Sequence, residues 1–257
     1  MTLGNFDGVH RGHQRIMREL TEEARARGAP AVAVTFEPHP IRVLRPDIAP
    51  GRILTAAQKQ EILTALGIDF LVIIRFTADF SRKSPEEFIR EVLVDKLHAA
   101  GLVLGGNFRF GRRRAGNLET LRVLGRDVGF TVREVAPALH RGEMISSSRI
   151  RRALGEGRVD EAAAMLGRPY FLDARVVPGD GRGRSIGYPT ANLALVGDLL
   201  AAEGVYVSTA RLDSGLYRGM THVGRRPTFA SEARVVETHL FDFSEDIYHQ
   251  RLRLYLH

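Results

Sequence analysis

The sequence predicts an α/β domain with a parallel sheet, followed by a small antiparallel β-barrel. In the first half of the chain, short β-branched or aromatic runs alternate with segments of helical pattern, which is typical of a parallel sheet covered on both faces. Beyond Gly167, short strands follow one another across turns without helices between them, which favours a barrel. A helix expected over Val159–Leu166 ends at Gly167. We therefore expect domains at 1–165 and 166–257.

Helix starts and strand-like runs divide both domains further. The capping-box patterns Thr55-Ala56-Ala57-Gln58 and Ser84-Pro85-Glu86-Glu87 each predict the start of a helix, and Gly67 ends the first of these helices. The strands expected in the first domain are Ala31–Phe36, Phe70–Arg75 and Leu102–Leu104. Those expected in the second are Asp173–Val177, Val205–Leu212, Met220–Val223, Val235–Phe241 and Leu252–Leu256.

The composition is that of a globular protein without disulfides. The 257 residues are 44% hydrophobic and 26% charged, and none is cysteine, which excludes thiolate metal sites and cysteine nucleophiles. No apolar run approaches the roughly 18 residues of a membrane-spanning helix, and the amino terminus lacks the features of a signal peptide. We expect a cytoplasmic protein with no membrane partner. The sequence does not predict an oligomeric state.

The positive charge of the chain invites comparison with nucleic-acid-binding proteins. The net charge is +7, but lysine occurs only at positions 59, 83 and 96, and the arginines are scattered apart from Arg112–Arg114. We interpret this excess as solvated arginine used in place of lysine, because net charge bears on solubility and association more than on fold. No nucleic-acid partner is expected, and a basic nucleic-acid-binding module is kept as a remote alternative.

A glycine-rich turn near the amino terminus carries two histidines. Leu3–His13 reads LGNFDGVHRGH, in which a strand end runs into turns at Gly4, Gly8 and Gly12 and then into a helix. His10 and His13 are three residues apart and share one face of the helix start. Backbone N–H groups there favour phosphate, and two imidazoles can stabilise charge developing on an α-phosphate. The alternatives are a metal pair or ordinary surface histidines; the HExxH arrangement is absent.

A serine-rich segment later in the chain has the pattern of a second helix start. In ISSSRIR, Ile145–Arg151, the serines Ser146–Ser148 can cap a helix while offering hydroxyl groups. Arg149 and Arg151 can supply charged donors to phosphate. A purely structural cap is the alternative explanation of these serines.

A third group of residues lies in the second domain. Gly179–Leu193 reads GDGRGRSIGYPTANL, which lacks the pattern of a P-loop. Thr190 and Asn192 offer a hydroxyl and an amide oxygen, the kind of ligand that Mg²⁺ prefers together with substrate phosphates. In VETHLFDF, Glu237 and His239 share one face of an expected strand; a glutamate so held could accept a proton from an attacking hydroxyl. An ordinary turn and a solvated glutamate are the alternatives.

These motifs together resemble a known family. GNFDGVHRGH, TFEPHP at 35–40, GGNFRFGRRRAGN at 105–117 and ISSSRIR follow in the order found in the flavin adenylyltransferase module of the HxGH nucleotidyltransferases. The resemblance implies a Rossmann-like domain in which FMN attacks ATP to give FAD and pyrophosphate. It further implies catalytic roles for His10, His13 and Arg151, ATP contacts from Gly4, Phe6, Gly8, His10, His13, Ser147, Ser148 and Arg151, and flavin contacts from Asn107, Phe108 and Arg109.

The second half of the chain resembles riboflavin kinase. GRGRSIGYPTANL, GVY at 204–206, THVGRRPTF at 221–229 and VETHLFDF follow in family order. The resemblance implies that Thr190 and Asn192 coordinate Mg²⁺–ATP, that Gly183 and Thr190 contact ATP, and that Glu237 activates the riboflavin 5′-hydroxyl toward the γ-phosphate. The whole chain is thus similar to bifunctional riboflavin kinase/FMN adenylyltransferases. An adenylyltransferase with an inactive kinase barrel is the alternative.

The chain departs from the family pattern at both ends and at one turn. Only Met1–Leu3 precede the histidine loop, and family members continue beyond position 257, so we expect an incomplete barrel with unpaired strand edges. His249 follows Asp246-Ile247-Tyr248 at a position where the family usually has glycine. A turn with positive φ would strain a histidine there.

Overall fold

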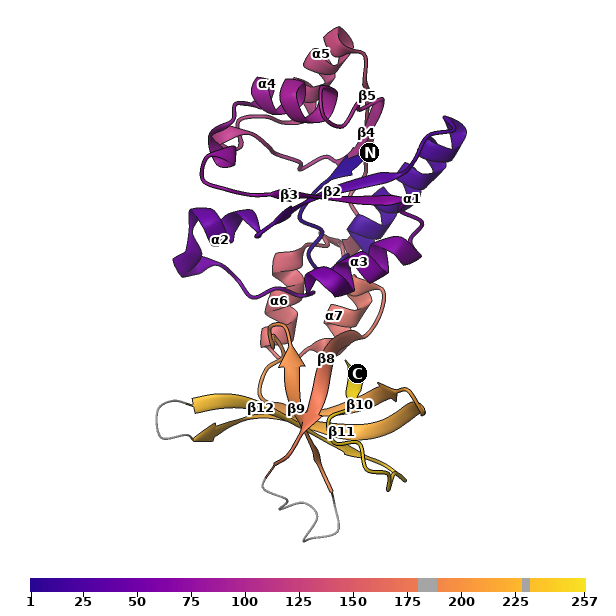
Figure 1. Cartoon of the computed structure of the whole chain (residues 1–257), viewed down its shortest axis with the longest axis vertical. Helices are drawn as coiled ribbons and strands as arrows, with labels where there is room; N and C mark the ends of the chain where they lie inside the picture. The colour runs from indigo at the N-terminus through magenta and orange to yellow at the C-terminus, as the bar shows by residue number, and fades with distance from the viewer. Residues whose placement is uncertain (180–188, 228–231) are drawn as a thin grey trace. The chain divides into compact units, whose positions relative to one another are not determined.

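The computed structural model describes residues 1–179, 189–227 and 232–257, which form two compact units (Figure 1). The first unit comprises Met1–Pro50 and Ala56–Ile145. The second comprises Gly51–Thr55 and Ser146–His257. No helix in these described ranges is long and apolar enough to cross a membrane.

The first unit contains parallel strands, as the alternating pattern predicts. β1, β2 and β3 form one parallel sheet in that order, and β4 pairs in parallel with β5. Val103 of β4 donates its backbone N–H to the carbonyl of Met1, which precedes β1, at 2.9 Å. A short antiparallel pair, β6 with β7, completes the strands. Their bounds are β1 Thr2–Leu3, β2 Val32–Glu37, β3 Phe70–Arg75, β4 Gly101–Gly105, β5 Thr131–Val135, β6 Leu139–His140 and β7 Glu143–Met144.

Several helices of this unit begin directly after a residue whose side chain caps them. Ser84 accepts from the N–H of Glu87 and forms the predicted capping box, with Pro85 at the first helical position. Asn117 makes an equivalent box that the sequence analysis did not identify. The helices are α1 Arg11–Ala26, α2 Pro40–Leu44, α3 Ala56–Ala65, α4 Pro85–Glu87 continuing as a π-helix over Phe88–Val94, and α5 Leu118–Val128, with 3₁₀ turns at Pro46–Ile48, Phe80–Arg82 and Arg112–Arg114.

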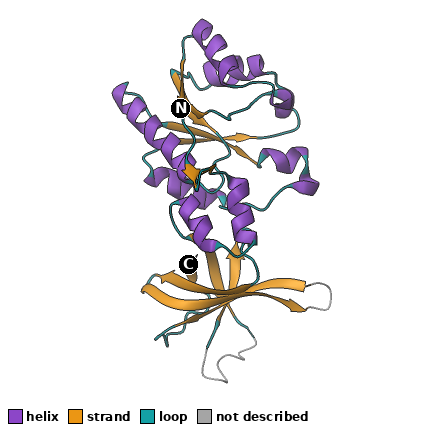
Figure 2. Ribbon diagram, turned by 180° about the vertical axis from the view of Figure 1, so that it is seen from behind, coloured by secondary structure: helices purple, strands orange, loops and turns teal. Residues whose placement is uncertain are grey.

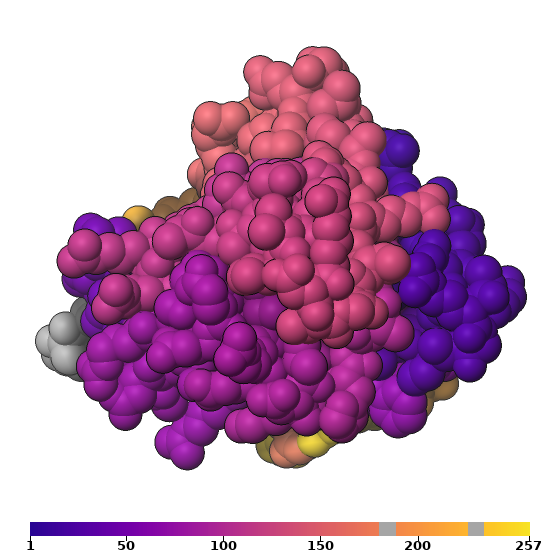
Figure 3. Space-filling view, turned by 90° about the horizontal axis from the view of Figure 1, so that it is seen from above, coloured from indigo at the N-terminus to yellow at the C-terminus, as the bar shows by residue number. Residues whose placement is uncertain are grey.

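One apolar core joins these strands and helices. Residues from β1, β2, the π-helix, β4 and α5 pack together with at most a few per cent of their surface exposed, among them Leu3, Val34, Leu93, Leu104 and Leu121. Burial of each such side chain contributes roughly 1.5–3 kcal/mol relative to leaving it in water. Figure 3 shows the surface over this core from the side of α4 and α5, with the indigo helix α1 beside the magenta segments.

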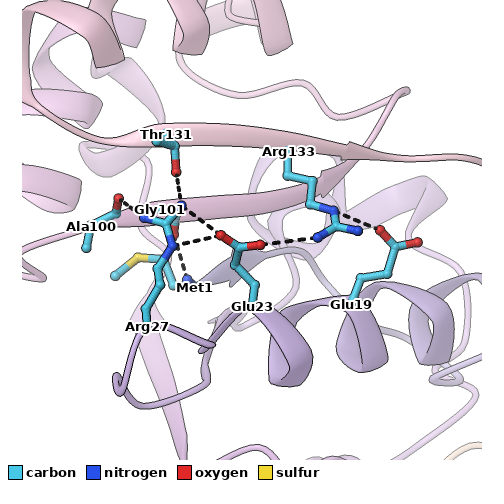
Figure 4. A network of polar contacts seen from close by, with 8 residues as sticks. All are labelled: Met1, Glu19, Glu23, Arg27, Ala100, Gly101, Thr131 and Arg133. Atoms are coloured by element: carbon cyan, nitrogen blue, oxygen red, sulfur yellow. Dashed lines mark hydrogen bonds and ion pairs between the residues drawn. The ribbon is translucent and has the colours of Figure 1, made fainter. Parts of the chain in front are cut away.

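Ion pairs attach the outer face of α1 to β5 (Figure 4). The guanidinium of Arg27 donates to Glu23 at 2.7 Å and to Thr131 at 2.9 Å. Arg133 reaches Glu23 at 3.2 Å and Glu19 at 3.3 Å. The hydrogen bonds from Arg27 and then Arg133 lower the pKa of the Glu23 carboxyl. Because these groups are exposed, each pair contributes at most about 1 kcal/mol, and the network serves mainly to orient α1.

The second unit consists of two helices and a closed antiparallel barrel, whose orange strands curve around in Figure 2. The ring order is β10-β11-β12-β9-β8-β13. The unpaired edges expected from the sequence do not occur, because β9, which the sequence analysis did not predict, bridges β12 and β8. The bounds are α6 Ser147–Gly155, α7 Val159–Leu166, β8 Tyr170–Val177, β9 Ala191–Val196, β10 Gly204–Leu212, β11 Gly215–Pro227, β12 Glu232–Leu240 and β13 Arg251–Leu256.

Three buried hydroxyl groups form a row in the barrel. Thr221 Oγ1 lies 2.8 Å from Ser208 Oγ and 2.9 Å from Thr238 Oγ1. All three residues are buried, with at most 2% of their surface exposed. Because each hydroxyl has a partner, the cost of burying these polar groups is compensated. The row links β10, β11 and β12 beneath the cavity described below.

Candidate active sites

The histidine loop connects β1 to α1 through a constrained backbone. Phe6 and Val9 have φ values of 48° and 37°, in the left-handed region that β-branched and bulky residues rarely adopt. The side-chain amide of Gln14 in α1 donates to the carbonyl of Val9 at 2.8 Å. Phe6 and Val9 are both buried. Backbone strain held in place by packing and a hydrogen bond is a feature of functional sites.

The two histidines of this loop stack on each other. The ring centroids of His10 and His13 are 3.7 Å apart with an angle of 18° between planes, and Phe6 meets His13 edge to face at 5.3 Å. His10 is the N-cap of α1: its Nδ1 accepts from the backbone N–H of His13 at 3.4 Å. Because Nδ1 accepts, the proton of neutral His10 lies on Nε2, giving an N–H that can donate to a phosphate oxygen.

Gly12 permits this packing. A Cβ at position 12 would lie 3.1 Å from Cε1 and 3.2 Å from Nδ1 of the His10 ring. A side chain there would therefore displace the ring of His10 from its stacked position. The first turn of α1 contains no acidic residue, so nothing within it competes with an anion for the helix N-terminus.

Burial keeps His13 neutral. Desolvation lowers the pKa of His13 well below the usual 6.5, and the nearby His10 and Lys59 lower it further. Its Nδ1 is buried and has no hydrogen-bond partner in the described part of the chain. Two stacked imidazoles could not both carry charge without strong repulsion.

A buried lysine next to this loop was not identified from the sequence. Lys59 of α3 is 6% exposed. Its Nζ lies 3.4 Å from Thr35 Oγ1 and 3.5 Å from Glu37 Oε1, both on β2. Thr35 in turn donates to the carbonyl of Asn5 in the histidine loop at 3.3 Å. The one available signal was that lysine is rare in a chain that uses arginine almost everywhere else.

The predicted flavin residues lie on one loop after β4. Asn107 and Arg109 are exposed and Phe108 is half-buried. Arg109 donates to the carbonyl of Phe108 at 2.8 Å. Two backbone hydrogen bonds between Phe110 and Gly116, of 3.1 and 2.9 Å, close the loop.

A row of aromatic rings supports this loop from below. The ring of Phe108 stacks on that of Phe110 at 5.7 Å, and Phe110 contacts Phe88 at 5.5 Å. The row continues through Phe80 to Phe36 at the end of β2. These contacts fix the ring of Phe108 at the surface, where a planar heterocycle can stack on it.

From Ser146 on, the ISSSRIR segment lies in the second unit, where it begins α6. Ser146 is the N-cap and accepts from the N–H of Arg149 at 3.3 Å. The cap is therefore Ser146, while Ser147 and Ser148 lie in the first turn. The Nε of Arg151 donates to the carbonyl of Gly51 at 2.7 Å, so part of its guanidinium already has a structural role.

The barrel carries a cavity of about 330 Å³. Thr190 and Asn192 both line it, together with Thr238 and Leu240 of β12 and the turn around Asp246. The structure thus brings the two predicted oxygen ligands together. Nowhere in the described ranges do three or more His, Cys, Asp or Glu side chains lie close enough together to hold a metal ion.

Glu237 is not among the residues that line this cavity. Its Cα pairs with that of Asn192 across β12 and β9, and side chains of directly paired residues lie on the same face of a sheet. Gly179 borders the same place: a Cβ there would lie 2.0 Å from the amide nitrogen of Asn192. Gly183, the remaining predicted ATP contact, lies outside the described residues.

The turn that follows β12 confirms the strain expected at His249. Its φ is 66°, and its N–H donates to the carbonyl of Val176 at 2.9 Å. Asp246 Oδ1 accepts from the N–H of Tyr248 at 2.9 Å. Because Asp246 and Tyr248 line the cavity, this turn forms part of its wall.

Comparison with known proteins supports the resemblance stated for each half of the chain. Residues 1–149 match the family model for FAD synthetase, and residues 166–257 match that for riboflavin kinase. The bifunctional riboflavin kinase/FMN adenylyltransferase of Escherichia coli (strain K12) is 36% identical over 257 residues, covering 100% of this chain and 82% of that protein. The protein of the same name from Pseudomonas fluorescens is 37% identical over 257 residues with the same coverage.

A solved structure has the same fold. The crystal structure described as a macrolide-efflux protein from Streptococcus pneumoniae superposes with a TM-score of 0.89 at 33% identity, covering 99% of this chain and 84% of that one. That description applies to the Streptococcus protein.

A nucleotidyltransferase half and a kinase half in one chain define a transferase that acts twice on flavin. The chain belongs to the bifunctional riboflavin kinase/FMN adenylyltransferase family. It is a transferase of FAD biosynthesis with both activities: phosphorylation of riboflavin to FMN and adenylylation of FMN to FAD. The match of residues 166–257 to riboflavin kinase does not favour the alternative of an adenylyltransferase with an inactive barrel.

Proposed function

We propose that His10 and His13 stabilise the charge that develops during adenylyl transfer. An oxygen of the FMN phosphate attacks the α-phosphorus of ATP, the bond to the bridging oxygen of the β-phosphate breaks, and pyrophosphate leaves. No covalent enzyme intermediate is needed, so catalysis depends on positioning and on donors aimed at the transferred group. The observation that carries this proposal is the stacked imidazole pair at the start of α1, where His10 is the N-cap, since it places two imidazoles at a helix N-terminus that favours phosphate.

The remaining contacts of this reaction are proposed from the family motifs. Ser147, Ser148 and Arg151 would bind the triphosphate, while Asn107, Phe108 and Arg109 would hold FMN. The ring of Phe108, fixed by its stacking on Phe110, offers a surface for the flavin. The backbone of Gly4, Phe6 and Gly8 would approach the nucleotide closely.

For the kinase step we propose that Glu237 accepts the proton of the riboflavin 5′-hydroxyl. The hydroxyl oxygen attacks the γ-phosphorus of ATP, the bond to the β-phosphate oxygen breaks, and ADP leaves. The pairing of Glu237 with Asn192, a proposed Mg²⁺ ligand, supports this assignment, because directly paired residues share one face of a sheet. Such a base typically contributes about 10²–10⁴-fold to a rate.

The donors that line the barrel cavity fit Mg²⁺. Thr190 and Asn192 supply a hydroxyl and an amide oxygen, which suit a hard cation that keeps substrate phosphates as further ligands. When bound, Mg²⁺ would neutralise negative charge on the ATP phosphates. The two side chains would fix where the nucleotide enters, and Gly179 would leave room for the amide of Asn192.

We further propose the domain limits 1–165 and 166–257, since the riboflavin kinase match begins at residue 166. The partners would be riboflavin, FMN and ATP, without nucleic acid or membrane. A cytoplasmic location is proposed because both steps consume ATP.

Separate assays of the two steps test these assignments. His13→Ala should abolish FAD formation from FMN and ATP while FMN formation from riboflavin and ATP continues. Glu237→Gln should do the reverse. If either variant left its own step near the wild-type rate, the corresponding assignment would be wrong.

A further inference from the structure

The pairing between β9 and β12 stops within the wall of the barrel cavity. It comprises Glu237 with Asn192 and Thr238 with Ala191. The next residues toward the amino terminus are Thr190 and Pro189, and proline has no N–H to continue the ladder. Thr190, which lines the cavity, therefore lies just beyond the last backbone pair between these strands.

His239 holds the chain where the ladder ends. Its Nδ1 lies 2.8 Å from the carbonyl oxygen of Pro189. A carbonyl can only accept, so Nδ1 carries the proton and donates it. The ring also meets that of Phe241 edge to face at 5.7 Å, which limits its rotation. A side chain of β12 thus binds the carbonyl of Pro189 just beyond the last backbone pair.

We propose that His239 is a positioning residue for the kinase reaction. By fixing the Pro189 carbonyl, it holds the peptide that leads into Thr190, so that the hydroxyl of Thr190 and the amide oxygen of Asn192 face the cavity together. This inference rests on the proposed kinase site. His239 lies two residues from Glu237 on the same strand face, so a role as proton acceptor is the competing explanation, and the Nδ1–H bond to Pro189 argues against that role for Nδ1.

Substitution of His239 in the full chain tests the proposal. His239→Ala removes the donor, whereas His239→Asn keeps an N–H donor near the position of Nδ1. We expect His239→Ala to lower kinase kcat/KM about tenfold, the equivalent of about 1.4 kcal/mol, chiefly through a higher KM for Mg–ATP. His239→Asn should recover most of this loss. FMN adenylylation in the same preparation should be unchanged in both.

Two controls make the result decisive. His257→Asn changes another barrel histidine, one whose Nε2 contacts the hydroxyl of Thr209, and should leave both activities unchanged. Melting temperatures report whether His239→Ala remains folded. In the wild-type protein, long-range ¹H–¹⁵N spectra should show the ring proton of His239 on Nδ1. An Nε2–H tautomer, or equal losses in His239→Ala and His239→Asn, would overturn the proposal.

The same assays separate this inference from the kinase site on which it rests. If Glu237→Gln and Thr190→Val keep full kinase activity, the site assignment fails, and the proposal for His239 fails with it. If those variants are impaired while His239→Ala is as active as wild type, only the positioning role is wrong.

Discussion

In the first unit the candidate phosphate ligands are two stacked imidazoles at the start of a helix of 16 residues, which His10 caps; in the barrel the candidate ligands are oxygen atoms of residues that line a cavity. Neither site has a P-loop. The first site offers two imidazoles at a helix N-terminus, and the second offers hard oxygen ligands suited to a metal-bound nucleotide. On the proposed assignments, the two halves of the chain use different kinds of ligand for attack at the α-phosphorus and at the γ-phosphorus of ATP.

Removing the donor of the first site should produce the largest effect. His10→Ala should lower kcat for FMN adenylylation about 10²–10³-fold, as expected for loss of one transition-state donor. The riboflavin kinase rate measured in parallel should not change. Loss of the N-cap also costs about 1 kcal/mol of stability. His10→Asn restores a capping side chain, so recovered stability without recovered activity would separate the two roles.

A side chain that crowds the rings of His10 and His13 should lower the rate of FMN adenylylation by a smaller factor. Gly12→Ala places a Cβ 3.1 Å from Cε1 of His10, and a small displacement of a catalytic group can reduce a rate by about tenfold or more. Gly155→Ala in α6, where a Cβ meets no atom within 4 Å, is the matched control. Equal adenylylation rates in the two variants would show that the position of the ring does not matter.

The burial of His13 should make the stability of the protein depend on pH. The barrel ligands Thr190 and Asn192 have no titratable side chain and should not contribute to this dependence. Because the folded-state pKa of His13 is lowered from 6.5, the unfolded chain takes up a proton first as the pH falls. Stability should therefore decrease below pH 6.5, by about 1.4 kcal/mol for each unit of pKa depression. Melting temperatures of wild type and His13→Gln, which cannot titrate, should change in parallel above pH 6.5 and diverge below it.

Lys59→Met provides a check on this interpretation. Loss of the nearby ammonium should raise the pKa of His13, which can be followed by NMR titration of its ring signals, because the charge of Lys59 helps to lower that pKa. An unchanged or lowered pKa would show that the charge of Lys59 does not help to lower the pKa of His13.

The smallest effect is expected at the cavity wall of the barrel. His249 has a φ of 66°, a conformation that costs a non-glycine residue about 1 kcal/mol or more. His249→Gly should raise the melting temperature by relieving this strain, while His249→Ala should not. A lower melting temperature for the glycine variant would show that contacts of the imidazole outweigh the strain.

Local patterns predicted much of the fold. Phe70–Arg75 and Val159–Leu166 match their observed bounds because each is an apolar segment with clear end signals. β9 was missed because Ala191–Val196 begins inside a Pro-Thr-Ala-Asn sequence that reads as a turn. The expected open edges were wrong because barrel closure depends on pairing between strands far apart in the chain, which no local pattern reports.

Only the part of the site that depends on local spacing could be predicted from the sequence. Spacing placed His10 and His13 on one face, but their stacking and the neutrality of His13 follow from burial that the sequence does not show. Lys59 was missed because a lysine is normally exposed, and its contacts with Thr35 and Glu37 exist only once α3 packs against β2. The role inferred for His239 likewise needed the observed end of the β9–β12 ladder.

Complementation between two inactive variants tests the central claim most directly. His13→Ala and Glu237→Gln proteins would be incubated with riboflavin, ATP and Mg²⁺, first separately and then mixed. We expect FMN without FAD from the first, neither product from the second, and FAD from the mixture, because each protein retains the site that the other lacks. No FAD from the mixture, or no FMN from His13→Ala alone, would contradict two independent sites in one chain.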